Sequence, residues 1–119
     1  MKLLRAAPRG SFLIVRIVGS QDLMQVQQDA PALRLSFPQT NRRQRTQRRP
    51  FEVACLIRRL KIERVEEEDS SLFLEAPLKG DDEAVAAHIL GLLCATFGTQ
   101  RDTPFELEAE GFALPAPRV

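Results

Sequence analysis

The stretch that decides the fold is residues 50–60, which read Pro50-Phe51-Glu52-Val53-Ala54-Cys55-Leu56-Ile57-Arg58-Arg59-Leu60. As a strand, this stretch places every second residue from Phe51 to Ile57 on one apolar face and needs a bulge at Arg58-Arg59. As a helix that begins at Pro50, it spaces apolar residues at i, i+3, i+4 and i+7 from Val53 to Leu60. The residue types favour a strand, so we predict a strand here and keep the helix as the alternative.

Residues 32–37, Ala-Leu-Arg-Leu-Ser-Phe, alternate apolar and polar side chains and predict a strand with one solvated face. If residues 51–59 are also a strand, the two form a long hairpin whose tip is the segment between them. The resulting prediction is an α+β fold: an antiparallel sheet of about five strands with one long helix, residues 81–97, packed on one face. If 51–59 is helical instead, residues 32–113 read β-α-β-β-α-β and predict a ferredoxin-like arrangement.

Three further regions carry strand patterns. Residues 12–18 are rich in β-branched side chains with apolar groups on both faces, which is typical of a central strand. Residues 60–65 and 71–76 flank a polar run and predict a hairpin. Residues 105–110 alternate strictly, which predicts a strand with its apolar face inward and three glutamates outward.

Residues 20–29 fit neither the period of a strand nor that of a helix, although Ser20 could cap a helix. We therefore predict a short helix or an irregular loop there. The chain as a whole is predicted to form a single domain, 1–119. Within it we expect three less regular parts: a leader at 1–10, an arginine-rich loop at 38–50 and a frayed tail at 115–119.

The clearest helix pattern covers residues 81–97. Acids occupy its first turn, apolar residues recur at helical spacing, and Gly98 is placed to end it. Within this helix, Ala87, Gly91 and Ala95 recur every four residues and leave one stripe almost free of side chains. Small residues at this spacing allow close packing, so we expect the stripe to contact the domain's own sheet, with a dimer seam as the alternative.

The net charge is +1, but the two halves of the chain carry opposite charges. Residues 1–51 hold ten Lys/Arg and two acids, a charge of +8, whereas residues 52–119 hold seven Lys/Arg and fourteen acids, a charge of −7. This asymmetry predicts a polyanionic partner for the basic half, or pairing of the halves within or between molecules. A homo-oligomer is one expected result.

The basic half is dominated by residues 41–50, Asn-Arg-Arg-Gln-Arg-Thr-Gln-Arg-Arg-Pro, which contain no acid and no hydrophobic residue. Guanidinium groups match phosphate, so we predict a loop that binds nucleic acid, RNA in preference to DNA. The predicted phosphate-binding residues are Arg42, Arg43, Arg45, Arg48 and Arg49. The chain has no Tyr or Trp, which argues against base stacking. The alternative is an assembly or regulatory role in which the basic loop docks on an acidic protein surface.

Catalysis is not expected, because phosphate-binding glycine loops, paired-histidine signatures and Cys-x-x-Cys pairs are all missing from the sequence. The lone His88 has only Ala, Val, Gly and Leu three and four positions away, so no neighbour on its helix would orient it as a general base. We therefore predict a non-enzymatic protein with no cofactor and no metal.

Cys55 and Cys94 lie within apolar patterns and are expected to be reduced thiols. This favours an intracellular, cytoplasmic location. A nuclear location stays open, and so does a mitochondrial one, because residues 1–21 contain four basic residues and no acid. No apolar run approaches the ~20 residues of a membrane span, so no membrane association is predicted.

Overall fold

The computed structural model describes residues 2–29, 32–67 and 69–112. The described strands are β1 (Phe12–Ile17), β2 (Leu23–Asp29), β3 (Ala32–Pro38), β4 (Glu63–Glu66), β5 (Leu72–Leu78) and β6 (Phe105–Glu110). The described helices are α1 (Lys2–Ala6), α2 (Arg42–Thr46), α3 (Arg48–Ile57) and α4 (Asp82–Phe97). The predicted tail at 115–119 lies outside the described residues.

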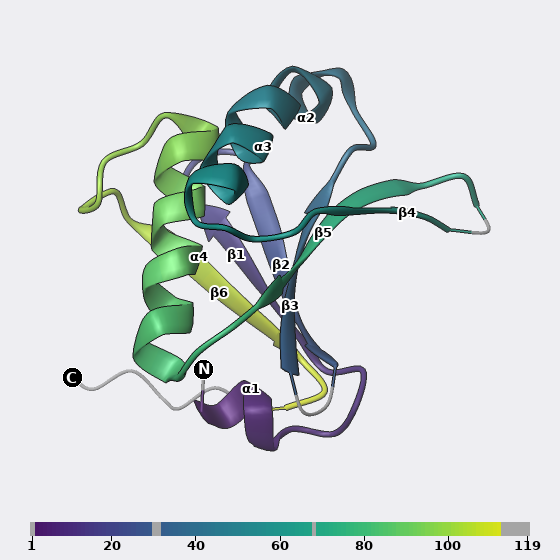
Figure 1. The fold of residues 1–119 in the computed structure, drawn as a ribbon, viewed down its shortest axis with the longest axis vertical. Helices are drawn as coiled ribbons and strands as arrows, with labels where there is room; N and C mark the ends of the chain where they lie inside the picture. The colour runs from purple at the N-terminus through teal and green to yellow at the C-terminus, as the bar shows by residue number, and fades with distance from the viewer. Residues whose placement is uncertain (1, 30–31, 68, 113–119) are drawn as a thin grey trace.

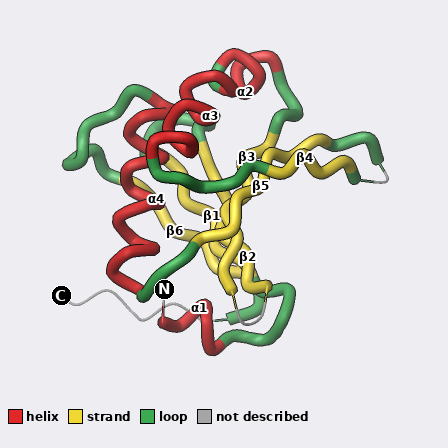
Figure 2. Tube along the Cα trace, in the orientation of Figure 1, coloured by secondary structure: helices red, strands yellow, loops and turns green. Residues whose placement is uncertain are grey.

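The strands form one antiparallel sheet in the order β4-β5-β3-β2-β1-β6. Helices α2, α3 and α4 lie on the same side of this sheet, and the β4–β5 hairpin reaches away from the rest of the molecule (Figure 1). The secondary-structure colouring shows the same two layers, helices over strands (Figure 2). The predicted α+β class is confirmed, whereas the detail of about five strands and one long helix is not exact, because the described residues form six strands and four helices.

The core lies between the sheet and these helices. Phe37 of β3 is fully buried, and its ring lies 5.0 Å from Phe51 of α3 and 5.8 Å from Phe97 of α4, measured between ring centroids. Tilted and edge-on ring pairs at such distances add to the gain from area burial. This aromatic contact joins the central strand to both long helices.

Residues 48–57 form a helix, so the predicted strand at 51–59 is wrong. The buried positions are Phe51, Ala54 and Cys55, which are spaced i, i+3 and i+4. Pro50 lies in the first turn, where its missing N–H has no helical partner to lose. Strand β3 therefore pairs with β2 and β5, and the predicted long hairpin does not form.

Residues 23–29 form strand β2, so the predicted short helix or loop at 20–29 is also wrong. Met24, Val26 and Gln28 point into the core at alternate positions. The outward positions hold Gln25 and Gln27, which weakens the hydrophobic alternation without breaking it. Because β2 lies between β1 and β3, pairing on both edges fixes its extended backbone.

The remaining predictions near the sheet hold in outline. β1 is an interior strand, and β4 and β5 form the predicted hairpin, although β5 continues through Pro77. Helix α4 has Asp81 as its N-cap and left-handed Gly98, at φ 66°, as its C-cap. The leader is partly ordered, because residues 2–6 form α1 and Leu4 is buried in the core.

The ferredoxin-like alternative has the right order of element types from β3 onward. Strands β1 and β2, however, lie between β3 and β6 in the sheet. The last strand therefore pairs with β1, joining Phe12 to Glu110 across the sheet. The chain thus has the β-α-β-β-α-β order of elements from β3 onward. Its strands do not form a four-stranded ferredoxin-like sheet, because β1 and β2 separate β3 from β6.

Candidate binding surface on α2 and α3

The arginine-rich segment forms helix α2 and the start of helix α3. The prediction of a loop at 38–50 is therefore wrong. Asn41 caps α2: its side chain accepts a hydrogen bond from the Gln44 backbone N–H at 2.8 Å. The Gln44 side chain in turn accepts from the Asn41 backbone N–H at 3.2 Å, completing a capping box. Gln44 is buried, so this short helix is anchored to the domain by its amide side chain.

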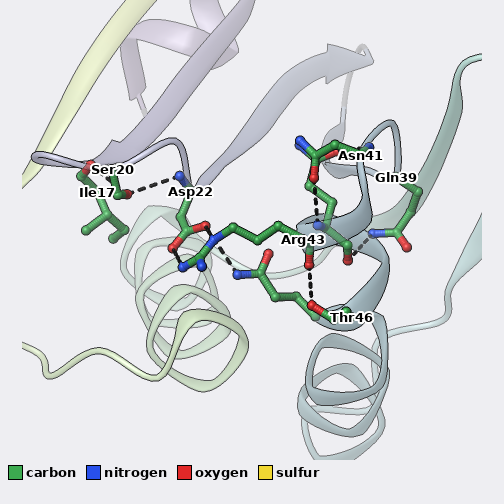
Figure 3. A network of polar contacts seen from close by, with 9 residues as sticks. Ile17, Ser20, Asp22, Gln39, Asn41, Arg43 and Thr46 are labelled. Atoms are coloured by element: carbon green, nitrogen blue, oxygen red, sulfur yellow. Dashed lines mark hydrogen bonds and ion pairs between the residues drawn. The ribbon is translucent and has the colours of Figure 1, made fainter.

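Arg43 is held by an acid of the same domain. Its Nε and Nη2 donate to the two carboxylate oxygens of Asp22 at 2.8 and 2.9 Å, and Gln47 Nε2 donates to Oδ1 at 3.2 Å (Figure 3). Asp22 is only 7% exposed. The hydrogen bonds from Arg43 hold the pKa of this carboxyl below its usual range, against the raising effect of burial. Arg43 thus joins α2 to the turn before β2.

Arg48 is also paired. Its Nε lies 2.9 Å from Oε1 of Glu52, one turn further along α3. Such exposed i,i+4 pairs stabilise a helix by only ~0.3–0.5 kcal/mol. Arg48 remains half exposed, so an external anion could still displace Glu52.

Three arginines of the segment have no side-chain partner among the described residues. The side chains of Arg42, Arg45 and Arg49 are exposed and make no ion pair or hydrogen bond with any residue that the structure describes. Arg42 and Arg45 lie three residues apart on α2, and Arg49 follows in the first turn of α3, beyond the break at Gln47. Of the five predicted phosphate-binding residues, these three form what we call the free basic cluster. Arg43 and Arg48 instead form ion pairs with acids of the same chain.

Next to this cluster, α3 presents a second apolar face to solvent. Val53 is 46% exposed, Leu56 76% and Ile57 72%. A hollow of about 480 Å³ lies beside Val53 and Leu56, and its lining consists of Arg49, Glu52, Val53, Leu56, Leu60 and Ile62. Large aliphatic side chains grouped at such exposure are unusual on a monomeric domain and mark an interaction surface. We call the three free arginines and this apolar face together the α2–α3 surface.

The small-residue stripe on α4 is used within the molecule at its centre. A Cβ atom at Gly91 would collide with the guanidinium of Arg58, which also donates to the Ala54 carbonyl at 3.0 Å. The close neighbour is therefore the end of α3, and not the sheet as predicted. Ala87 and Ala95, the other two members, are exposed.

Other chemical groups are dispersed. In residues 2–29, 32–67 and 69–112, no group of three or more His, Cys, Asp or Glu is placed to hold a metal ion. Burial raises the pKa of the Cys55 thiol to about 11. No helix of the described chain is both long and apolar enough to cross a membrane. The predicted absence of catalysis and of cofactors stays a prediction.

The chain matches no protein family model, no curated protein and no solved structure.

Sequence reasoning missed the exposed half of the α2–α3 surface. The helical pattern read from the sequence took Val53, Leu56 and Ile57 as the inward face, whereas they point outward. A usable signal was present, because residues 51–57 hold two interleaved apolar sets at helical spacing, and one core can bury only one of them. The pairing of Arg43 with Asp22 left no pattern, since the two are 21 positions apart.

Proposed function

We propose that this chain is a non-catalytic assembly or regulatory domain whose α2–α3 surface binds an acidic, partly apolar segment of a partner protein. The observation that carries the proposal is the exposure of Leu56 and Ile57 on the helix that also carries the free Arg49, which lines the same hollow as Leu56. Charge complementarity selects an acidic partner, and the apolar face and its hollow receive aliphatic or aromatic side chains. An intracellular, cytoplasmic location fits this role and stays a prediction.

The contributions of the two halves of the surface differ in kind. Burying one large aliphatic side chain contributes ~1.5–3 kcal/mol, so Leu56 and Ile57 would supply most of the affinity. Exposed charge pairs contribute only ~0–1 kcal/mol each. The arginines would chiefly speed the encounter and select against basic partners.

RNA binding, the first expectation from composition, is less well supported by this geometry. Of the five predicted phosphate-binding arginines, Arg42, Arg45 and Arg49 have no ion pair with a described residue. Aliphatic side chains such as Val53 give bases no aromatic surface on which to stack. RNA therefore enters as an outcome of the test and not as the favoured ligand.

The test compares two probes: a fluorescent amphipathic peptide in which glutamates and leucines recur at helical spacing, and a twenty-nucleotide uridine RNA. We expect the double variant Leu56→Ser/Ile57→Ser to weaken peptide binding at least tenfold. Its thermal midpoint should be nearly unchanged, because both side chains are exposed in the free protein. The matched control is Val18→Ser, which removes an exposed apolar side chain outside the α2–α3 surface and should leave peptide binding unchanged.

Nucleic acid would give a different pattern. If three arginines neutralise phosphates on a single strand, log affinity for the RNA should fall with log salt at a slope of roughly −2. The apolar double variant would then bind RNA as well as the unchanged protein does, while Arg42→Gln/Arg45→Gln would flatten the slope. That result, together with no detectable peptide binding, would overturn the protein-partner proposal.

A further inference from the structure

Strand β6 forms one end of the sheet, so one side of its backbone faces no other strand of the described chain. The Val18 N–H donates to the Pro104 carbonyl at 3.1 Å, which makes these two a hydrogen-bonded pair. Hydrogen-bonded and non-hydrogen-bonded pairs alternate in an antiparallel ladder. With the observed register, Glu106, Glu108 and Glu110 bond to β1. The N–H and C=O groups of the alternate residues Phe105, Leu107 and Ala109 therefore point outward.

A shallow apolar groove runs beside this edge on the helix side of the sheet. It measures about 320 Å³, and its lining consists of Leu13, Val15, Ala86, Ile89, Leu90, Leu93, Arg101, Phe105 and Leu107. Phe105 and Leu107 are each 45% exposed, so α4 does not cover the apolar face of β6. The apolar face of this strand was predicted to be buried, but its side chains at Phe105 and Leu107 are only half-buried.

The opposite face of β6 is acidic. Glu106, Glu108 and Glu110 are exposed, and their side chains form no ion pair with any described residue. A strand added beside β6 would place alternate side chains over the groove and beside these carboxylates. The two faces of β6 thus favour a partner strand in which apolar side chains alternate with basic ones.

We propose that the β6 edge is a strand-addition site for an extended protein segment in which apolar side chains alternate with basic ones. Backbone pairing with Phe105, Leu107 and Ala109 gives the binding energy, and alternating side chains give the specificity. The apolar side chains would enter the groove against α4, and the basic ones would meet the glutamates. This site is separate from the α2–α3 surface and prefers the opposite charge.

A second copy of β6 is a poor occupant. Antiparallel pairing of two identical β6 strands would place three glutamates from each copy on one shared face. Like charges on neighbouring strands are destabilising, and charged side chains of this kind protect edge strands from self-association. The acidic row therefore selects a basic partner strand and disfavours a copy of itself.

The experiment adds an eight-residue peptide, in which leucine alternates with lysine, to the ¹⁵N-labelled full chain and follows amide hydrogen exchange by NMR. At saturating peptide, exchange at the outward amides of Phe105, Leu107 and Ala109 should slow at least tenfold. The amides of Glu106 and Glu108 already bond to β1, so their exchange should hardly change. Uniform or absent slowing at millimolar peptide would overturn the proposal.

Three controls separate strand addition from simple charge attraction. A peptide with four leucines followed by four lysines has the same composition and should bind at least tenfold more weakly. When the peptide pairs antiparallel to β6, N-methylation of the leucines removes the N–H groups that face β6 and should abolish the effect, whereas N-methylation of the lysines should leave it. If the block peptide and both N-methylated peptides bind as tightly as the alternating peptide, the association is electrostatic and involves no strand pairing.

Protein variants test the charge selection. Glu106→Gln/Glu108→Gln should weaken the alternating peptide several-fold at low salt, while Glu66→Gln/Glu67→Gln on the β4–β5 hairpin removes the same charge elsewhere and should not. Protection of the three outward amides that appears without peptide and rises with protein concentration would show that a second copy occupies the edge, and the proposal would fail.

Discussion

Asp22 takes one arginine of the basic segment, Arg43, into an internal ion pair. Its carboxylate is almost wholly buried and receives hydrogen bonds from Arg43 and Gln47. A buried carboxylate without these donors would carry a large desolvation cost, so the arrangement ties α2 to the sheet. At the residue scale, charge counting alone overstates the binding surface, because a guanidinium that satisfies an internal acid is not free for a ligand.

Replacing Asp22 by Asn should lower the free energy of unfolding at pH 7 by about 1–2 kcal/mol, since the hydrogen bonds are charge-assisted but Arg43 is largely exposed. The pKa of Asp22 is lowered in the folded state. Its stabilising effect is therefore complete above the unfolded pKa of ~3.9 and is lost as pH falls through the folded value. Urea unfolding of the variant and the unchanged protein at pH 7 and at pH 3 measures the loss of stability and its dependence on pH.

The matched control for this prediction is Glu52→Gln, which breaks the exposed pair with Arg48 and should cost ~0.5 kcal/mol or less. A difference between Asp22→Asn and the unchanged protein that stays the same at both pH values would contradict the assigned ion pair.

At the scale of elements, the sequence predicted the segments with a strong hydrophobic period and failed where the pattern was weak or ambiguous. Helix α4 carries caps at both ends and a single helical period, so its limits were correct within about one residue. Residues 51–57 fitted both a strand and a helix pattern, and their residue types favoured the strand. The packing of Phe51 on Phe37 decides between them, and Phe37 lies on β3, outside any local window.

The contact between α3 and α4 gives an element-scale prediction. In an Arg58→Ala background, Gly91→Ala should stabilise the protein by ~1 kcal/mol through helix propensity. In the unchanged protein the gain should be smaller, because the new methyl group displaces the Arg58 guanidinium. Thermal or urea unfolding of both single variants and the double variant measures this coupling. Additive effects would show that Arg58 does not pack on Gly91 in solution.

At the scale of the molecule, the opposite charges of the two halves meet partly inside one chain. Arg5 Nε lies 2.6 Å from Asp82, and Arg34 Nη1 lies 2.9 Å from Glu63. The sequence predicted pairing of the halves without choosing these partners, which depend on the strand order. The free charges that remain include the basic cluster on α2–α3 and the acidic face of β6.

These remaining charges predict weak self-association by contact between the basic cluster of one molecule and an acidic face of another. Light scattering at low salt should give a mass above that of the monomer, and added salt should restore the monomer mass. Arg42→Gln/Arg45→Gln should remove the effect. Monomer mass at every salt concentration would contradict it. Association that strengthens with salt would instead indicate self-pairing of β6 edges, whose carboxylates repel.

The pairing of β1 with β6 also constrains the order in which the fold can be completed during synthesis. It joins positions as distant as 12 and 110, whereas β1, β2 and β3 are neighbours along the chain. At ~5–20 residues per second on the ribosome, the three-stranded meander can form seconds before β6 emerges. Throughout that interval β1 is itself an edge strand with apolar side chains on both faces, so the nascent chain exposes an aggregation-prone edge until β6 pairs with it.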